Sequence, residues 1–353
     1  MRAAVTESQR QASAPFVRQA HSPRTGPWPP RTRIAVLIPC FNEEAAIEQV
    51  VCDFKAALPS AKLYVYDNDS QDRTVERAQA AGAIVRSEPM RGKGHVIRRM
   101  FSDIEADIYL LVDGDNTYEA AAAPAMVETL VTQSLDMVTG HRIATGQAYR
   151  TGHRIGNSLL TGVVAAIFGS RTSDMLSGYR AFSRRFVKSF PALSRGFEIE
   201  TELTVHALEL RMPIADVDTQ YVARLPGSTS KLSTFKDGIR ILGTIAALVK
   251  EERPMQFFGL TSIVLALLSL ALAYPVLAEY LRTGLVPRFP TAILCSALMI
   301  VAILSFFAGL ILDSVTHSRR ELKRLTYLRF HGISVAIERL VASQARQAFR
   351  RTS

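Results

Sequence analysis

Cysteine is scarce in this sequence, and its placement excludes two kinds of structural support. The 353 residues include only Cys40, Cys52 and Cys295, and no two of them form a CxxC pair. An odd number of scattered cysteines provides neither a disulfide framework nor a structural metal site. We therefore expect these three side chains to behave as small buried hydrophobic groups.

The middle of the chain lacks the excess of positive charge that a nucleic-acid-binding protein needs. The net charge is +10, but residues 1–33 contribute +5 and residues 313–353 contribute +6, so that residues 34–312 carry −1. Binding to a phosphate backbone depends on clustered Lys and Arg. The distribution therefore argues against a nucleic-acid partner. The first residues also lack the apolar run of a signal peptide, and we expect residues 1–31 to form a disordered basic arm.

Two long runs without a charged residue predict a hairpin of membrane-spanning helices. The runs cover residues 257–278 and 289–312, and about 20 apolar residues cross a hydrocarbon core of ~30 Å. The expected helices lie at about 257–280 and 289–312. Lys and Arg are concentrated before the first helix and after the second, which predicts that both termini, and the chain before the hairpin, face the cytosol. The predicted location is the cytoplasmic (inner) membrane, with a multi-pass topology.

Strand-like and helix-like segments alternate before the hairpin. Apolar runs at residues 34–38, 63–66, 83–85 and 108–112 predict buried strands, and residues 73–81 and 94–101 predict helices. A further helix is expected to open at Asn42, with that side chain as its N-cap. The alternation predicts an α/β fold in which ligands bind at the carboxyl ends of the strands.

Polar residues follow three of these strands, as PCFNE at 39–43, DNDSQD at 67–72 and DGDNT at 113–117. Asp113 and Asp115 flank Gly114, so both carboxylates can reach one ion. Carboxylate oxygens suit Mg²⁺ or Mn²⁺, which bridge to phosphate oxygens. The acids at 67–72 also fit turn and capping roles. The lysine in RGKG at 91–94 is not part of a P-loop, because the GxxxxGK[ST] spacing is absent.

These motifs, together with DMLSGYR at 174–180, GFEIE at 196–200 and STSK at 228–231, resemble those of glycosyltransferase family 2. Within it the chain is similar to the polyprenyl-phosphate sugar transferases, such as dolichol-phosphate mannose synthase and the bacterial undecaprenyl-phosphate glucosyltransferases. The resemblance implies a hexosyltransferase with a GT-A fold, a Rossmann-like nucleotide-diphospho-sugar domain, followed by the hairpin. It also implies a UDP- or GDP-sugar donor, an undecaprenyl or dolichyl phosphate acceptor, and Mg²⁺ or Mn²⁺.

The resemblance assigns roles to individual positions. Four residues would line the nucleoside pocket: Pro39, Phe41, Glu43 and Asn68. The metal and the donor diphosphate would be bound by Asp113 and Asp115, with Lys93 and Gly114 in the same substrate site and Arg142 near the phosphates. The lipid phosphate would be held by Arg154 and Ser158. A loop carrying Arg224 and Lys231 would close over the donor.

The expected chemistry needs positioning more than a strong base. A polyprenyl phosphate is largely dianionic at pH 7, because its second pKa lies near ~6. One in-line attack at the anomeric carbon would invert the configuration, with Arg154 holding the acceptor and Arg142 or Arg224 on the donor side. The metal and Lys231 would stabilise the departing nucleoside diphosphate. The expected catalytic residues are Asp113, Asp115, Arg142 and Arg154.

The predicted organisation has five parts: a basic arm at 1–31, a GT-A catalytic domain at 32–235, a juxtamembrane interfacial helix at 236–256, the hairpin at 257–312 and a basic cytosolic tail at 313–353. Residues 149–168 and 237–249 are expected to be interfacial helices that present the site to the bilayer. The tail suits a helix on an anionic leaflet and equally a solvated helix. Glu198, Glu200 and Glu202 fit two roles, orienting Arg, Lys or sugar hydroxyls and favouring a helix start.

Three rival functions are less well supported. A processive polysaccharide synthase would resemble its family in a QxxRW motif, but the only tryptophan is Trp28, in the basic arm. A transferase with a soluble acceptor would not need the hairpin. A non-catalytic membrane scaffold or nucleic-acid-binding protein would not need the acidic pair. The sugar, the length of the lipid and the oligomeric state, a homo-oligomer included, stay open.

Overall fold

The computed structural model describes residues 28–29, 32–144, 174–196, 198–222 and 253–352, and the positions 162, 247 and 250–251. The chain divides into two compact units. One, the α/β unit, comprises Met1–Leu232 and Thr326–Ser353; the other, the hairpin unit, comprises Ser233–Leu325. The hairpin unit is thus an insertion between two parts of the α/β unit. Most of the predicted basic arm lies outside the described residues, as do both predicted interfacial helices apart from positions 162 and 247.

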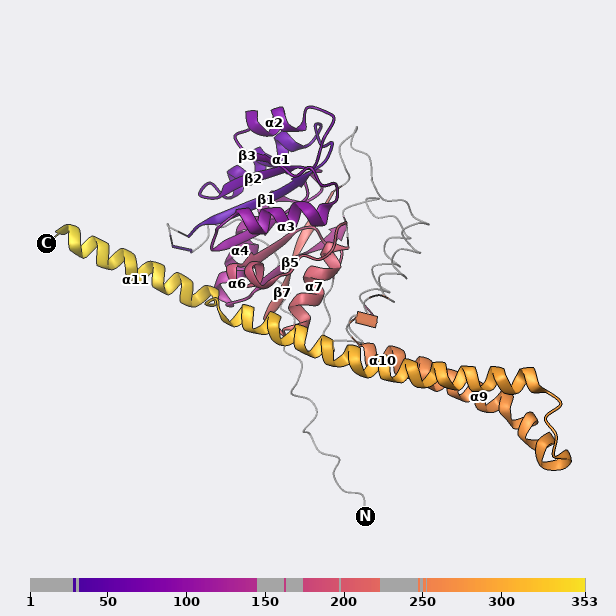
Figure 1. Cartoon of the computed structure of the whole chain (residues 1–353). Coiled ribbons are helices and arrows are strands. Elements are labelled where there is room, and N and C mark those ends of the chain that lie inside the picture. The colour runs from indigo at the N-terminus through magenta and orange to yellow at the C-terminus, as the bar shows by residue number, and fades with distance from the viewer. Residues whose placement is uncertain are drawn as a thin grey trace, which may run out of the picture. The chain divides into compact units, whose positions relative to one another are not determined.

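The α/β unit is built on a seven-stranded sheet with the order β3-β2-β1-β4-β6-β5-β7 (Figure 1). The strands are β1 (Ile34–Cys40), β2 (Lys62–Asp67), β3 (Ile84–Ser87), β4 (Ile108–Leu111), β5 (Met137–Ala144), β6 (Arg180–Ser183) and β7 (Ile214–Tyr221). β6 is antiparallel to β4 and β5, and the other pairs are parallel. One edge, the carboxyl edge, therefore gathers the carboxyl ends of six strands and the start of β6. The opposite edge is the amino edge.

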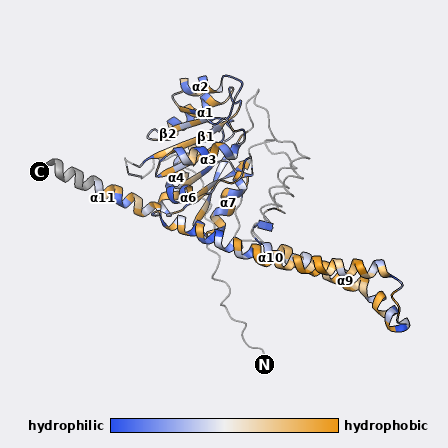
Figure 2. Cartoon of the chain, in the orientation of Figure 1, coloured by the Kyte–Doolittle hydropathy of each residue, from blue (hydrophilic) through white to orange (hydrophobic). Residues whose placement is uncertain are grey.

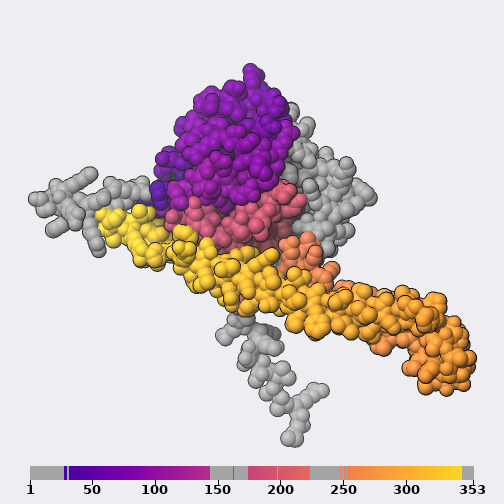
Figure 3. All heavy atoms as spheres, in the orientation of Figure 1, coloured from indigo at the N-terminus to yellow at the C-terminus, as the bar shows by residue number. Residues whose placement is uncertain are grey.

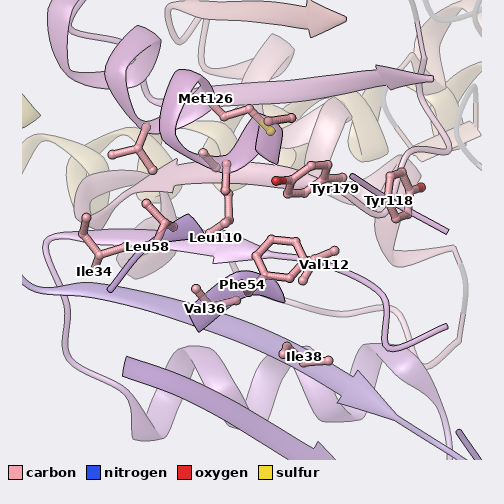
Figure 4. Close-up of a cluster of buried hydrophobic side chains, with 14 of the residues drawn as sticks. Ile34, Val36, Ile38, Phe54, Leu58, Leu110, Val112, Tyr118, Met126 and Tyr179 are labelled. Atoms are coloured by element: carbon pink, nitrogen blue, oxygen red, sulfur yellow. The ribbon is translucent and has the colours of Figure 1, made fainter. Parts of the chain in front are cut away.

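Helices cover both faces of this sheet. They are α1 (Ile47–Ala57), α2 (Thr74–Ala80), α3 (Lys93–Asp103), η2 (Ala120–Ala122), α4 (Ala123–Thr132), α6 (Arg184–Ser189), α7 (Ile199–Glu209) and α11 (Ile333–Thr352). Successive side chains of a strand point to opposite faces. Ile34, Val36 and Ile38 of β1 accordingly pack with Phe54 of α1 in one apolar cluster (Figure 4). Leu37 packs in the second cluster, with α3, α6 and α7.

The α/β prediction is confirmed, since strands occupy all four predicted positions. The prediction that a helix opens at Asn42 is wrong, because α1 begins at Ile47. Asn42 instead has a left-handed backbone (φ 52°), a conformation that Asn tolerates better than most residues. Its side-chain Oδ1 accepts a hydrogen bond from the backbone N–H of Gln71 (2.8 Å). The asparagine therefore joins the loops after β1 and β2 instead of capping a helix. The prediction that all three cysteines are buried is also wrong for Cys52, which is exposed on α1, whereas Cys40 and Cys295 are buried.

The hairpin unit contains α9 (Pro254–Thr283) and most of α10 (Phe289–Leu328). Both helices are long and apolar enough to cross a membrane, and their most apolar stretches are only 6% and 17% buried (Figure 2). The two predicted apolar helices are confirmed, although α10 continues well past residue 312. The Ser269 hydroxyl donates to the carbonyl oxygen of Cys295 (2.8 Å), which ties α9 to α10. The exposed apolar faces indicate that this unit associates with a membrane.

Candidate active site

The loops at the carboxyl edge are held together by one buried amide. Asn68 follows β2, and its side-chain nitrogen donates to the carbonyl oxygens of Glu88 and Met90 (both 2.8 Å). Its side-chain oxygen accepts from the backbone N–H of Gly92 (2.7 Å). The amide therefore fixes the segment that leads from β3 into α3. Asn68, predicted to line the nucleoside pocket, shapes this edge through the backbone of residues 88–92.

The other three predicted nucleoside-pocket residues also lie at this edge. Pro39 is the second-last residue of strand β1, and Glu43 is buried in the loop that follows this strand. Between them, the Phe41 ring lies under the Arg91 guanidinium, whose central carbon is 5.2 Å from the ring centroid. Arg91 in turn pairs with Asp69 (2.8 Å). The loops after β1, β2 and β3 thus meet around an aromatic ring and a guanidinium.

The acidic pair follows β4 at the centre of the carboxyl edge. Asp115 is 4% exposed, and its Oδ1 accepts hydrogen bonds from the Thr117 hydroxyl (2.6 Å) and backbone N–H (3.3 Å). Asp113 is more accessible, with 29% of its side chain exposed. A Cβ atom on the intervening Gly114 would lie 2.6 Å from the Cys40 sulfur. Glycine is therefore required for this loop to approach β1 so closely.

A buried lysine links the acidic pair to a second carboxylate. The Nζ of Lys93, the first residue of α3, lies 2.5 Å from Oδ1 of Asp113 and 2.5 Å from Oε1 of Glu200. Burial by itself would lower the pKa of Lys93, but the two carboxylates outweigh it and raise that pKa. Burial also raises the pKa of Glu200, which Lys93 partly offsets. The lysine therefore remains charged, and its ion pair holds the Asp113 carboxylate in place.

The far side of the acidic pair is formed by β5, β6 and β7. Arg142 of β5 makes a bidentate ion pair with Asp174, in which Nε and Nη2 donate to the two carboxylate oxygens (2.6 and 2.7 Å). Its guanidinium carbon also lies 5.4 Å from the centroid of the Tyr221 ring, at the end of β7. Gly178 packs so closely against Asp113 that an added Cβ would clash with the carboxylate. Lys93, Asp113, Asp115 and Arg142 thus occur along one edge of the sheet.

Several site residues fall outside these observations. Arg154, Ser158, Arg224 and Lys231 lie outside the described residues, and their predicted roles stay predictions. Two contacts were missed from the sequence: Asp174, which holds Arg142, and Tyr221, which stacks on it. The role of Glu200 was left open between two alternatives. In the structure Glu200 lies at the start of α7 and forms an ion pair with Lys93. The only indication in the sequence that Asp174 belongs to the site was its place at the start of the DMLSGYR motif at 174–180.

The donor set of the acidic pair fits the predicted divalent cation. Among the described residues no three His, Cys, Asp or Glu side chains form a complete metal site. Mg²⁺, however, is commonly bound by one or two carboxylates, with substrate phosphates and water completing the coordination. Asp113 and Asp115, two residues apart at a strand end beside a glycine, offer hard oxygen ligands of that kind. A cation at this pair stays a prediction that the geometry supports.

Replacing Gly94 with alanine is expected to destabilise the α/β unit by about 1–3 kcal/mol, as overpacking does. The added Cβ would clash with the backbone carbonyl of Ser194. The Gly94 N–H also donates a hydrogen bond to the carbonyl oxygen of the next residue, Arg195 (3.1 Å). Gly259→Ala is the matched control, since nothing lies within 4 Å of a Cβ there. Thermal unfolding should show a lower Tm for Gly94→Ala alone, and an equal Tm in both variants would contradict this packing.

A mostly parallel α/β sheet with an acidic pair and basic side chains at its carboxyl edge is the architecture of a GT-A nucleotide-sugar transferase. The sequence profile of glycosyl transferase family 2 matches residues 35–190. A glycosyltransferase, AglJ, of Haloferax volcanii is 32% identical over 299 residues, which are 84% of this chain and 98% of that protein. The chain therefore belongs to glycosyl transferase family 2, and the predicted family is confirmed.

Further relatives agree with this assignment. An uncharacterized protein of Shigella flexneri is 58% identical over 154 residues, 44% of this chain and 94% of that protein. A dolichyl-phosphate hexose transferase of Haloferax volcanii is 26% identical over 221 residues, 62% of this chain and 95% of that protein. The family and these names confirm the prediction of a hexosyltransferase enzyme.

A solved structure supports the fold. Glucosyl-3-phosphoglycerate synthase from Mycobacterium tuberculosis, in complex with Mn²⁺, UDP and glucosyl-3-phosphoglycerate, aligns with a TM-score of 0.54 and 25% identity. The alignment covers 67% of this chain and 87% of that one. The predicted GT-A fold is confirmed, and this neighbour binds a divalent cation together with its nucleotide.

Proposed function

We propose that the chain transfers a hexose from a UDP- or GDP-sugar to a polyprenyl phosphate held in the membrane, giving a lipid-linked monosaccharide. The observation that carries this proposal is the presence, in one chain, of the acidic carboxyl edge and of two helices with exposed apolar faces. An acceptor that is itself lipid-bound gives the enzyme a reason to remain at the bilayer. The relative named dolichyl-phosphate hexose transferase supports the same acceptor class.

The chain's own residues would act by positioning charge. Asp113 and Asp115 would hold Mg²⁺ or Mn²⁺, which supplies Lewis-acid stabilisation of the nucleoside diphosphate leaving group. Lys93 fixes the rotamer of Asp113 through the ion pair at 2.5 Å. Arg142, held rigid by Asp174 and Tyr221, would present its guanidinium on the phosphate side of the site. The phosphate of the acceptor is already an adequate nucleophile at pH 7.

The predicted residues outside the description complete this proposal. Arg154 and Ser158 would bind the acceptor phosphate, and Arg224 and Lys231 would cover the bound donor. Lys and Arg are concentrated before the first apolar helix and after the second. This distribution favours an enzyme of the cytoplasmic membrane whose catalytic domain faces the cytosol. A cytosolic site would meet nucleotide sugars on the side where the lipid phosphate is exposed.

A second candidate acceptor is a small phosphorylated carboxylic acid. The structural neighbour from Mycobacterium tuberculosis is a glucosyl-3-phosphoglycerate synthase with the same fold over two thirds of this chain. Both acceptors carry a phosphate group, so the same basic side chains would suit either. The hairpin favours the lipid, because a soluble acceptor gains nothing from a membrane-bound enzyme.

A competition assay separates the two acceptors. Full-length protein in lipid vesicles would receive Mn²⁺, a panel of UDP- and GDP-hexoses, and either undecaprenyl phosphate or 3-phosphoglycerate. We expect one donor to be consumed with the lipid and a kcat/KM for the lipid at least tenfold above that for phosphoglycerate, about 1.4 kcal/mol of preference. Consumption with phosphoglycerate alone would replace the proposed acceptor with the second candidate.

A further inference from the structure

The chain returns to the α/β unit after the second apolar helix. Residues 327–337, called here the return segment, comprise the end of α10, a short turn and the start of α11 (Figure 1). In Figure 3 the yellow atoms of this part of the chain lie against the α/β unit. The sequence did not predict this contact, since residues 313–353 were expected to lie on a leaflet or in solvent.

A fully buried carboxylate holds the return segment. Asp136 precedes β5 and is 0% exposed. It accepts hydrogen bonds from Nε and Nη2 of Arg185 (3.0 and 2.7 Å) and from the Ser183 hydroxyl (2.7 Å). The fourth donor is the Tyr327 hydroxyl, at 2.7 Å. The same Arg185 lies over the Tyr327 ring, with its central carbon 4.2 Å from the ring centroid. One tyrosine therefore completes both the carboxylate's and the guanidinium's contacts.

The return segment crosses the amino edge and engages both faces of the sheet. Tyr327 packs against the apolar cluster formed with α3, α6 and α7. Ile333, only 3% exposed, is buried in the opposite cluster, formed with α1, α2 and α4. Between these two points Arg184 lies over the Phe330 ring at 5.1 Å. The Ser334 hydroxyl also meets the Ser134 hydroxyl at 2.6 Å. Such a two-faced contact is specific packing, unlike that of a solvated tail.

We propose that Asp136, Arg185 and Tyr327 are positioning residues that lock the return segment, which continues the long apolar helix α10, to the amino edge of the sheet, and that transfer to a bilayer-held acceptor depends on this attachment. This inference rests on the proposed lipid acceptor. With the return segment docked, the sheet is attached directly to the end of α10, and a shorter connection raises the effective concentration of the site at the lipid phosphate. Donor binding and transfer to an acceptor that diffuses freely do not depend on it.

The test compares Tyr327→Ala with wild-type full-length protein in vesicles. The control is Leu325→Ala, a nearby apolar truncation at a position that is 61% exposed. We expect Tyr327→Ala to reduce transfer to vesicle-held undecaprenyl phosphate by roughly tenfold, since it removes a hydrogen bond to a charged group and its stacking. Transfer to a short polyprenyl phosphate in detergent and UDP binding should stay within about twofold of the wild type. Equal losses with both acceptors, or no loss, would overturn the inference.

A reversible crosslink supplies the rescue. In a Cys52→Ser background, which removes the exposed native cysteine, Ser134→Cys and Ser334→Cys would join the return segment to the loop before β5. Oxidation should restore vesicle transfer to the Tyr327→Ala protein, and reduction should abolish the gain. An oxidised protein that stays inactive on vesicles would contradict the positioning role.

Trypsin makes the result independent of the proposed function. Cleavage after Arg329 should be faster in Tyr327→Ala than in the wild type and Leu325→Ala, and oxidation of the crosslinked variant should slow it. If the wild type transfers to no lipid but this difference appears, the proposed acceptor is wrong and the docking stands. Equal cleavage in all variants would overturn the docking itself.

Discussion

Replacing Asp115 with alanine is expected to reduce hexose transfer by on the order of 10³-fold. The carboxylate is one of two oxygen-donor groups that would hold the divalent cation, and such a cation contributes several kcal/mol to stabilising the leaving diphosphate. Asp115 lies in the loop after β4, where its Oδ1 accepts hydrogen bonds from the Thr117 hydroxyl and backbone N–H. The measurement is the initial rate of nucleoside diphosphate release over a Mn²⁺ titration.

The matched control is Glu48→Ala, which removes an exposed carboxylate in the first turn of α1. This variant should keep its activity within about twofold of the wild type. If Asp115→Ala retained wild-type rates at every Mn²⁺ concentration, the assignment of the metal to the acidic pair would be wrong. A loss of activity in both variants would point to a general defect in folding.

Replacing Lys93 with methionine is expected to destabilise the α/β unit by about 3–5 kcal/mol, because it leaves two carboxylates near each other without their shared cation. The lysine side chain is 9% exposed and that of Glu200 6%, so solvent does little to screen the remaining repulsion. Activity should fall as well, since Asp113 loses the contact that fixes its rotamer. Chemical denaturation by urea, followed by circular dichroism, measures the stability change.

The double variant Lys93→Met with Glu200→Gln distinguishes charge from packing. Neutralising Glu200 removes the buried unpaired charge and should recover at least half of the lost stability, without restoring activity. Arg73→Met is the control, because that arginine also pairs with a carboxylate, Glu44, but its own side chain is 71% exposed. A single-variant loss no larger than that of the control would show that the buried triad contributes little.

The fold could be predicted from the sequence because its signals are local. Runs such as IAVLI at 34–38 are too apolar for anything but a buried strand, and they lie where β1 lies. The start of α1 could not be placed, because Asn42 is used to bind the neighbouring loop at Gln71 and not the helix behind it. That choice depends on a partner 29 residues away, which a local pattern does not contain.

The site was predictable to the extent that its residues sit at strand ends. Asp113 and Asp115 follow a strand and Lys93 opens a helix, so the α/β rhythm brings them to one edge. Their pairing was not predictable in the same way: Lys93 meets Glu200 across 107 positions. The Asp136–Tyr327 contact spans 191 positions and the whole hairpin unit. Such contacts follow from tertiary packing, and no spacing in the sequence encodes them.

The measurement that tests the central claim most directly is mass spectrometry of the lipid product. Full-length protein in vesicles with undecaprenyl phosphate would be incubated with Mn²⁺ and the donor panel, and the lipids extracted into organic solvent. The expected result is a lipid phosphate carrying one added hexose, with an anomeric configuration opposite to that of the donor. Hexose found only in the aqueous phase, as free sugar or on a soluble acceptor, would contradict the account.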